Sequence, residues 1–194
     1  MKKLLTGALA LIAFTASAQY KVGQKVSDFS LKNVDGKTVS LTSYDKGAIV
    51  IFTCNHCPFS KAYEDRIIAL HNKYAGKGYP VVAINPNDAV KSPDDSYPKM
   101  QERAKEKAFP FAYLYDETQE VAKAFGAART PHVFIVKKEN KEWILKYIGA
   151  IDNNTEDAAK ADKKYTEDAL EALLAGKNPS PSETKALGCT IKWK

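Results

Sequence analysis

The stretch AIVIFTCNHCPF, residues 48–59, decides the fold. Residues 48–53 form an apolar run of strand length, which is typical of a strand covered on both faces. Cys54 and Cys57 come next, and a helical pattern then continues to about residue 74, with large apolar residues at three- and four-residue spacing. The two cysteines are therefore predicted to lie where a buried strand passes into a helix.

The other segments alternate between strand and helix patterns. This alternation predicts an α/β fold with a mainly parallel sheet, crossover helices and a closing antiparallel hairpin. Functional groups on such sheets lie beyond the carboxyl ends of the strands, which is where the cysteine pair falls. We expect a hairpin over residues 28–41, strands over 81–84, 111–115, 132–137 and 143–148, and helices over about 97–107, 117–125 and 162–175.

The first eighteen residues have the three parts of a secretory signal peptide. A lysine pair precedes an apolar run over residues 4–14, and Ala-Ser-Ala follows at 16–18. The run is shorter than the ~20 residues that span a bilayer. We therefore expect an exported protein, periplasmic or otherwise extracytoplasmic, with no transmembrane segment once the signal is removed. Its parts would be the signal peptide, one folded domain over 19–176 and a C-terminal tail over 177–194.

Composition and charge exclude several classes of protein. Hydrophobic residues make up 44% of the 194 positions, which is typical of a globular domain. Of the 29 Lys and Arg residues, two fall in the leader, so 27 against 23 acids leave a net charge of +4. These cations are scattered among acids, so nucleic acid is not an expected partner. Three cysteines are too few for a disulfide scaffold.

The cysteine pair has the spacing of a redox couple. Cysteines three residues apart at the start of a helix face the same direction, within reach of a reversible disulfide. The free amides of a helix N-terminus favour negative charge and lower a thiol pKa. We expect Cys54, the more exposed sulfur, to be the nucleophile and Cys57 to resolve the mixed disulfide. His56, between them, would tune the couple by carrying charge near the thiolate.

Other uses of the pair are weaker. No second C-x-x-C and no H-x₃₋₅-H follows, so neither a metal nor another cofactor is expected, and a metal-binding module on Cys54, Cys57 and His56 is the least favoured function. Haem attachment would need a histidine where Pro58 stands. A purely structural disulfide in an exported protein remains an alternative.

The order of strand, C-x-x-C and helix, with Thr130-Pro131 entering a strand some seventy residues later, resembles the thioredoxin fold. A more specific resemblance is to exported, peroxiredoxin-like thioredoxin proteins of the alkyl hydroperoxide reductase/thiol-specific antioxidant (redoxin) superfamily. It implies a thioredoxin-like fold: a central mixed sheet flanked by helices, with an N-terminal β-hairpin extension. It also implies a cis bond before Pro131, with Thr130 and Pro131 positioning an extended substrate. The motifs are IFTCNHCPF (51–59), AYEDR (62–66), VAIN (82–85), DETQEVA (116–122) and GCTIKW (188–193).

The same resemblance implies a second activity. Peroxiredoxins carry T-x-x-C, and here Cys57 occupies the peroxidatic position while Cys54 replaces the threonine. Cys57 would attack a peroxide to form a sulfenic acid, which Cys54 or Cys189 would resolve. Arg129 is the candidate cation beside that thiolate.

We therefore expect a thiol–disulfide oxidoreductase that acts on protein or small thiol substrates and is reset by a membrane or periplasmic redox partner. A thiol peroxidase with an antioxidant role is the alternative. Cys189 is a resolving cysteine, a cysteine that pairs with a second subunit, or a small buried hydrophobe. His132 either reaches the site or is satisfied at the sheet edge. Glu64 and Asp65 are expected on a solvated helix face.

Overall fold

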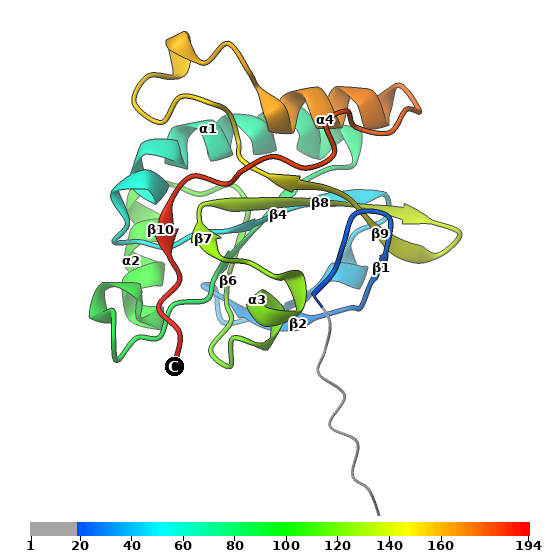
Figure 1. Cartoon of the computed structure of the whole chain (residues 1–194). Coiled ribbons are helices and arrows are strands. Elements are labelled where there is room, and N and C mark those ends of the chain that lie inside the picture. Colours follow the sequence, from blue (N-terminus) through cyan, green and yellow to red (C-terminus); the bar gives the residue numbers. More distant parts are fainter. Residues whose placement is uncertain (1–18) are drawn as a thin grey trace, which may run out of the picture.

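The computed structural model describes residues 19–194, and the predicted signal peptide lies outside the described residues (Figure 1). The chain folds into a thioredoxin-like α/β structure in which helices flank a central mixed sheet. Within residues 19–194, no helix combines the length and the apolar character needed to cross a membrane.

The central sheet has eight strands in the order β1-β9-β8-β4-β5-β6-β2-β3. β4, β5 and β6 run parallel, and the remaining neighbours pair antiparallel. The predicted hairpin is β2–β3, which extends the sheet beyond β6. The strands are β1 (Lys25–Val26), β2 (Ser30–Asn33), β3 (Thr38–Ser40), β4 (Gly47–Phe52), β5 (Val81–Asn85), β6 (Ala112–Tyr115), β7 (Arg129–Thr130), β8 (His132–Glu139), β9 (Glu142–Gly149) and β10 (Cys189–Thr190).

All four predicted helices are present. They are α1 (Pro58–Tyr74), α2 (Tyr97–Glu106), α3 (Glu120–Phe125) and α4 (Tyr165–Leu174), with short 3-10 turns at Leu41–Ser43, Ala75–Lys77, Pro93–Asp95 and Ala158–Lys160. Helix α3 begins later than the predicted residue 117, because Gln119 has a left-handed backbone conformation (φ 64°) that cannot continue a helix.

Strand β4 is buried on both faces, which explains its unbroken apolar sequence. Ile49 and Ile51 pack in the core cluster that includes residues of α1, α2 and α4. Val50 and Phe52 point to the opposite face and pack with residues of α3 and the hairpin. The parallel pairing of β4 with β5 fixes the direction in which β4 delivers the cysteine loop to α1.

The C-terminal segment returns to that loop. From the end of α4 it runs back across the molecule, and β10 lies beside β7 (Figure 1). The two short strands pair antiparallel, with Cys189 opposite Thr130. Ile191 is buried in the α3-side core cluster. The C-terminal end of the predicted tail is therefore packed against the rest of the described chain.

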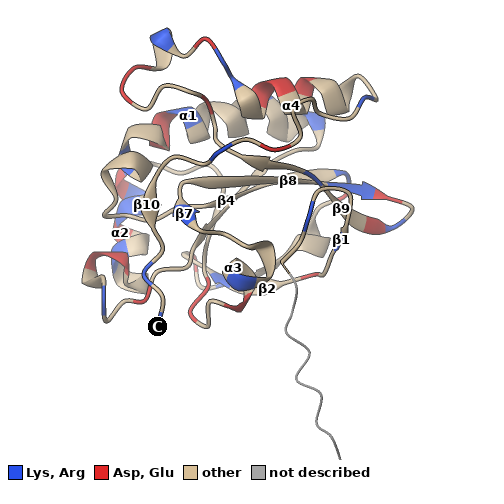
Figure 2. Cartoon of the chain, viewed as in Figure 1, with Lys and Arg blue, Asp and Glu red and all other residues tan. Residues whose placement is uncertain are grey.

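Residues of both charge signs are interspersed along the helices (Figure 2). Many are paired across a turn or between elements, such as Lys99 with Glu102 at 2.7 Å and Lys146 with Glu139 at 2.8 Å. This mixture is typical of a solvated surface.

Candidate active site

The cysteine loop joins the carboxyl end of β4 to α1, as the sequence predicted. Cys57 is the N-cap residue of α1, with extended backbone angles, and Pro58 fills the first helical position. A proline is favoured there because the first helical amides have no partner within the helix. The carbonyl of Cys57 accepts the backbone N–H of Lys61 at 3.0 Å, which begins the helical hydrogen bonding.

The disulfide in the structure joins Cys57 to Cys189, not to Cys54. Their Cα atoms are 6.2 Å apart, although 132 positions separate them in sequence. The reason is the pairing of β10 with β7: it sets Cys189 opposite Thr130, and the carbonyl oxygen of Thr130 lies 3.3 Å from the Cys57 sulfur. Of the roles considered for Cys189, this geometry supports the resolving cysteine.

Cys54 is free but not open to solvent. Its side chain is 3% exposed, and its sulfur lies 3.2 Å from the Thr130 hydroxyl and 3.7 Å from the Ser60 hydroxyl. Burial raises the pKa of the Cys54 thiol, and the negative charge of Asp95 raises it further. The expectation of an exposed Cys54 with a lowered pKa is thus wrong for this state, because desolvation outweighs the hydrogen bonds that favour the thiolate.

Asp95 is a site residue that the sequence did not indicate. It is fully buried, and its carboxylate accepts the backbone N–H of Asn55 at 2.7 Å, the Asn87 side chain at 2.8 Å and the Ser92 hydroxyl at 2.7 Å. It also pairs with Nδ1 of His56. The loop after β5 therefore fixes the cysteine loop after β4. The carboxyl ends of adjacent parallel strands meet at one edge of a sheet. This rule could have indicated that the loop after β5, which contains Asp95, lies beside the cysteine loop.

His56 and Asn55 are held by this network. Besides the Asp95 pair, Nδ1 of His56 lies 3.0 Å from the Ser92 hydroxyl. The Asn55 side chain donates to the carbonyl of Asp94 at 2.8 Å and accepts from the buried Tyr113 hydroxyl at 2.8 Å. The loop between the cysteines is thus oriented by hydrogen bonds on both of its residues.

Metal-ligating atoms of Cys54, His56 and Asp95 lie within 4.8 Å of one another. This grouping differs from the predicted metal module, which used Cys57, because Cys57 is held in the disulfide. Both Asp95 oxygens already accept hydrogen bonds, and the Cys54 sulfur contacts two hydroxyl groups. The grouping is therefore a satisfied hydrogen-bond network as it stands.

Thr130 and Pro131 lie at the site as expected, and the peptide bond between them is cis, as the resemblance implied. Thr130 is fully buried: its hydroxyl contacts the Cys54 sulfur and its carbonyl contacts the Cys57 sulfur. This residue touches both cysteines of the C-x-x-C pair.

Arg129 and His132 flank that pair without a hydrogen bond to a cysteine in the described residues. Arg129 is exposed and donates to the carbonyl of Gly188 at 3.4 Å. His132 accepts the backbone N–H of Ala128 at 3.3 Å and packs against Phe134 with ring centroids 4.5 Å apart. Burial lowers the pKa of His132 to about 4, so the ring is neutral. This geometry fits a histidine with a satisfied hydrogen bond at the start of β8, which is an inner strand and not the expected sheet edge.

The two acids Glu64 and Asp65 on α1 have different environments. Glu64 is buried and bonds the Arg103 guanidinium at 2.8 and 2.6 Å, with Lys107 at 3.5 Å. The prediction of a solvated Glu64 is wrong, because α2 packs on this part of α1, whereas Asp65 is exposed as predicted.

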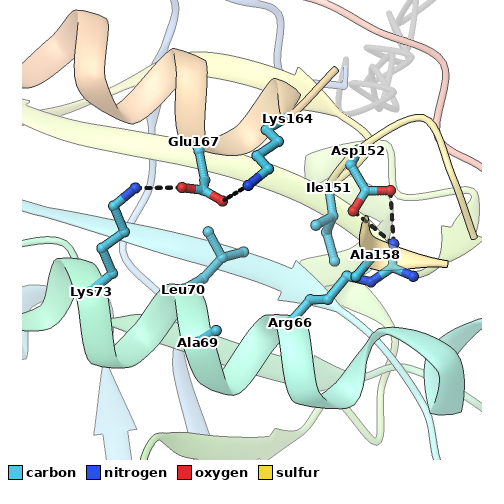
Figure 3. Close-up of a pocket in the computed structure, with 9 residues that line it drawn as sticks. All are labelled: Arg66, Ala69, Leu70, Lys73, Ile151, Asp152, Ala158, Lys164 and Glu167. Carbon is cyan, nitrogen blue, oxygen red and sulfur yellow. Dashed lines mark hydrogen bonds and ion pairs between the residues drawn. The ribbon is translucent and has the colours of Figure 1, made fainter. Parts of the chain in front are cut away.

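A separate small pocket of about 130 Å³ lies between α1 and α4 and contains no cysteine (Figure 3). Arg66 closes one end through Asp152 at 2.7 Å, and Lys73 and Lys164 both reach Glu167 at the other. The charged side chains that line the pocket are therefore already paired with one another, and these pairs hold α1 against α4 and the segment before it.

Strand, cysteine loop, helix and cis-proline segment together define a thioredoxin-like redox protein. Residues 22–141 match the AhpC/TSA family, and the chain belongs to that family. It is an oxidoreductase.

Two solved structures share the fold, and a curated relative is a thiol-disulfide oxidoreductase. The chain is 40% identical to an uncharacterized conserved protein from Geobacillus kaustophilus, with a TM-score of 0.81 over 91% of this chain and 94% of that one. A hypothetical protein from Sinorhizobium meliloti is 32% identical, with a TM-score of 0.82 over 92% and 97%. The thiol-disulfide oxidoreductase ResA of Geobacillus thermodenitrificans is 26% identical over 132 residues, covering 66% of this chain and 70% of the relative.

Proposed function

We propose that the protein catalyses thiol–disulfide exchange on protein or small thiol substrates and that Cys57 is its central sulfur. The observation that carries this is a disulfide from Cys57 to Cys189 with a third cysteine, the free Cys54, on the same loop. Cys54 and Cys189 both adjoin Thr130, one through the threonine hydroxyl and the other through strand pairing. Thr130 thus lies beside all three cysteines, with Cys57 joined to Cys189 and Cys54 left as the free thiol.

The exchange is a pair of sulfur substitutions. In the reduced protein, the Cys57 thiolate attacks one sulfur of a substrate disulfide, and the other substrate sulfur leaves as a thiolate. The thiolate of Cys54 or Cys189 then attacks Cys57, forms a disulfide with it and releases the second substrate sulfur. Two electrons pass to the substrate, and the reverse sequence oxidises a substrate dithiol. This order makes Cys54 a resolving thiol, the opposite of the role that the sequence suggested.

The surrounding residues position these sulfurs. Thr130 contacts the sulfurs of Cys54 and Cys57, and its main chain pairs with an extended strand. Together with Pro131 it would position the substrate backbone. Asp95 and His56 act through the loop that they hold in place.

Single cysteine variants test the proposal. With dithiothreitol as reductant and insulin as substrate, Cys57→Ser should reduce the rate of disulfide cleavage to the uncatalysed background. Cys54→Ser and Cys189→Ser should each retain part of the rate, because the other thiol still resolves Cys57. A Cys57→Ser protein that cleaves insulin disulfides at the wild-type rate would refute the assignment.

We also propose that the chain is exported and works in an extracytoplasmic compartment, where a membrane or periplasmic redox partner resets the cysteines. The support is the three-part pattern of residues 1–18. Intact mass and N-terminal sequencing of protein from the periplasmic fraction should give a chain that starts at Gln19. A chain that retains residues 1–18 would contradict the cleavage.

A second candidate is a thiol peroxidase. The specific support is that Cys57, the N-cap residue of α1, is joined to Cys189 as a resolved peroxidatic cysteine would be. The Cys57 thiolate would take an oxygen from the peroxide to give a sulfenic acid and water, and Cys189 would displace hydroxide to form the disulfide. Arg129 was expected to place its positive charge beside the Cys57 thiolate. Its guanidinium instead donates to the carbonyl of Gly188, so Arg129 does not add to the support for a peroxidase.

Stopped-flow oxidation of the reduced protein by hydrogen peroxide separates the two activities. Peroxidase chemistry predicts loss of two thiols per protein, orders of magnitude faster than free cysteine, and lost in Cys57→Ser. Oxidation at the rate of free cysteine would leave exchange as the activity.

A further inference from the structure

We propose that residues 188–191 occupy the position that a protein substrate takes, as part of the same chain. The substrates would then be extended peptides with glycine immediately before the reacting cysteine. The inference rests on the proposed function and adds a substrate class to it. It comes from the way in which the chain's own Gly188-Cys189-Thr190-Ile191 lies against β7 and the cis-proline segment.

The binding of this segment uses main-chain pairing. Cys189 lies opposite Thr130 and Thr190 opposite Arg129 in an antiparallel pair, and the Ile191 N–H reaches the Ala128 carbonyl at 3.5 Å. Strand β7 pairs with β10 and with no strand of the central sheet. The C-terminal segment is therefore a strand added to the edge of β7. Strand addition of this kind takes its affinity from main-chain hydrogen bonds and its specificity from side-chain positions.

The covalent geometry is that of a mixed disulfide. A cysteine within an extended strand is joined to Cys57 at the N-terminus of α1, and its strand partner Thr130 also contacts the sulfur of Cys54. An incoming substrate that reacts with Cys57 would present the same arrangement, with its own cysteine in place of Cys189 and with Cys54 beside it to resolve the bond.

Gly188 sets the strongest side-chain requirement. A Cβ atom at this position would lie 2.3 Å from the carbonyl oxygen of Thr130, 2.7 Å from its carbonyl carbon and 3.0 Å from the nitrogen of Pro131. All three are backbone atoms, so no side-chain rotation relieves the contact. The position before the cysteine therefore excludes every residue that has a Cβ atom, unless the backbone shifts.

The positions after the cysteine differ from each other. The side chain of Thr190 is exposed, whereas Ile191 is 4% exposed and packs in the α3-side core cluster. A substrate strand should therefore tolerate many residues directly after its cysteine and favour an apolar residue one position further on.

The segment beyond Ile191 is held through its backbone and through Trp193, whose side chain packs against the α3-side core cluster. The N–H and carbonyl of Lys192 bond Asn87 and Asp88 at 2.9 Å each, and the Lys194 N–H bonds the side chain of Gln119 at 2.9 Å. Since main-chain atoms make these bonds, a peptide that brings apolar residues to the sites of Ile191 and Trp193 can replace the tail once the Cys57–Cys189 disulfide is reduced.

The test measures how fast Cys57 forms a mixed disulfide with peptides. The full-length Cys54→Ser/Cys189→Ser variant keeps only Cys57, so the product is not resolved. The probe is a nonapeptide with the sequence of residues 186–194, its cysteine activated as a disulfide with thionitrobenzoate. The Cys57 thiolate attacks the peptide sulfur and releases the thionitrobenzoate anion, which is followed by absorbance. Matched peptides carry alanine in place of the glycine or of the threonine.

We expect the glycine-to-alanine peptide to react at least tenfold more slowly and the threonine-to-alanine peptide to react within twofold of the parent. Rates of the three peptides with free cysteine correct for intrinsic reactivity. Equal corrected rates for the glycine and alanine peptides would overturn the proposal. If Cys57 still reacts with small disulfides in that case, the proposed function stands; if it reacts with neither, the proposed function fails.

A second measurement uses the intact chain. In the Cys54→Ser background, Gly188→Ala should lower the effective concentration of Cys189 toward Cys57, measured by equilibration with glutathione, at least tenfold. Thr190→Ala, at the exposed neighbouring position, should leave it within twofold. An unchanged effective concentration in Gly188→Ala would also overturn the proposal. As a control, circular dichroism would be recorded to check that the Gly188→Ala variant is folded.

Discussion

Loss of the Cys57–Cys189 disulfide should destabilise the domain strongly, because this bond closes a long loop. The two cysteines are 132 positions apart. Cross-linking a loop of that length removes conformational entropy from the unfolded chain, and the chain-entropy relation gives about 5 kcal/mol at 25 °C. Whole domains are stable by roughly 5–15 kcal/mol, so this one bond would contribute a large share. For a domain of this size, the corresponding shift in Tm is about 10–20 °C.

Two matched variants isolate the effect. Cys54→Ser can form only the Cys57–Cys189 bond, and Cys54→Ser/Cys189→Ser can form none within the chain. Urea unfolding at neutral pH, with and without dithiothreitol, should give a free energy of unfolding about 5 kcal/mol higher for oxidised Cys54→Ser than for its reduced form. The double variant should match the reduced form and ignore the reductant. An unfolding midpoint of Cys54→Ser that does not respond to dithiothreitol would refute the reasoning.

Three further predictions follow from the buried titrating groups. The folded state keeps His132 neutral with a pKa of about 4, so stability should fall as the pH drops from 6.5 toward 4, by about 3 kcal/mol in all. His132→Gln should flatten that fall in acid unfolding, and an unchanged slope would contradict it. Asp95→Asn should move the pH profile of Cys54 alkylation in the oxidised protein to lower pH, because the carboxylate raises that thiol's pKa. Thr130→Val should move the profile to higher pH, because its hydroxyl stabilises the thiolate; shifts of the same sign in both variants would refute the assigned contacts.

The framework of the fold could be predicted because its signals are local. The apolar run at 48–53 has the composition of a strand buried on both faces, and β4 is that strand. The spacing of apolar residues after Cys57 matches α1, whose buried face includes Tyr63, Ile67 and Leu70. The cysteine loop then falls at the strand-to-helix junction, since chain order alone places it there.

The sequence left the partner of Cys57 open between Cys54 and Cys189, because the choice depends on tertiary contacts. Nothing in local pattern indicates that Cys189 pairs opposite Thr130, since the two-residue strands β7 and β10 are too short to show a periodicity. The burial of Cys54 has the same origin, and so does the pairing of Asp95 with a loop some forty residues away. Helix-terminus chemistry suggested a lowered thiol pKa, but desolvation by those tertiary contacts decides its direction.

The most direct test of the account is the disulfide pairing itself. Oxidised full-length protein would be unfolded in the presence of an alkylating agent, digested without reductant and mapped by mass spectrometry. The account predicts a cross-linked pair of peptides that contain Cys57 and Cys189, with Cys54 alkylated. A Cys54–Cys57 disulfide within one peptide, with Cys189 alkylated, would contradict it.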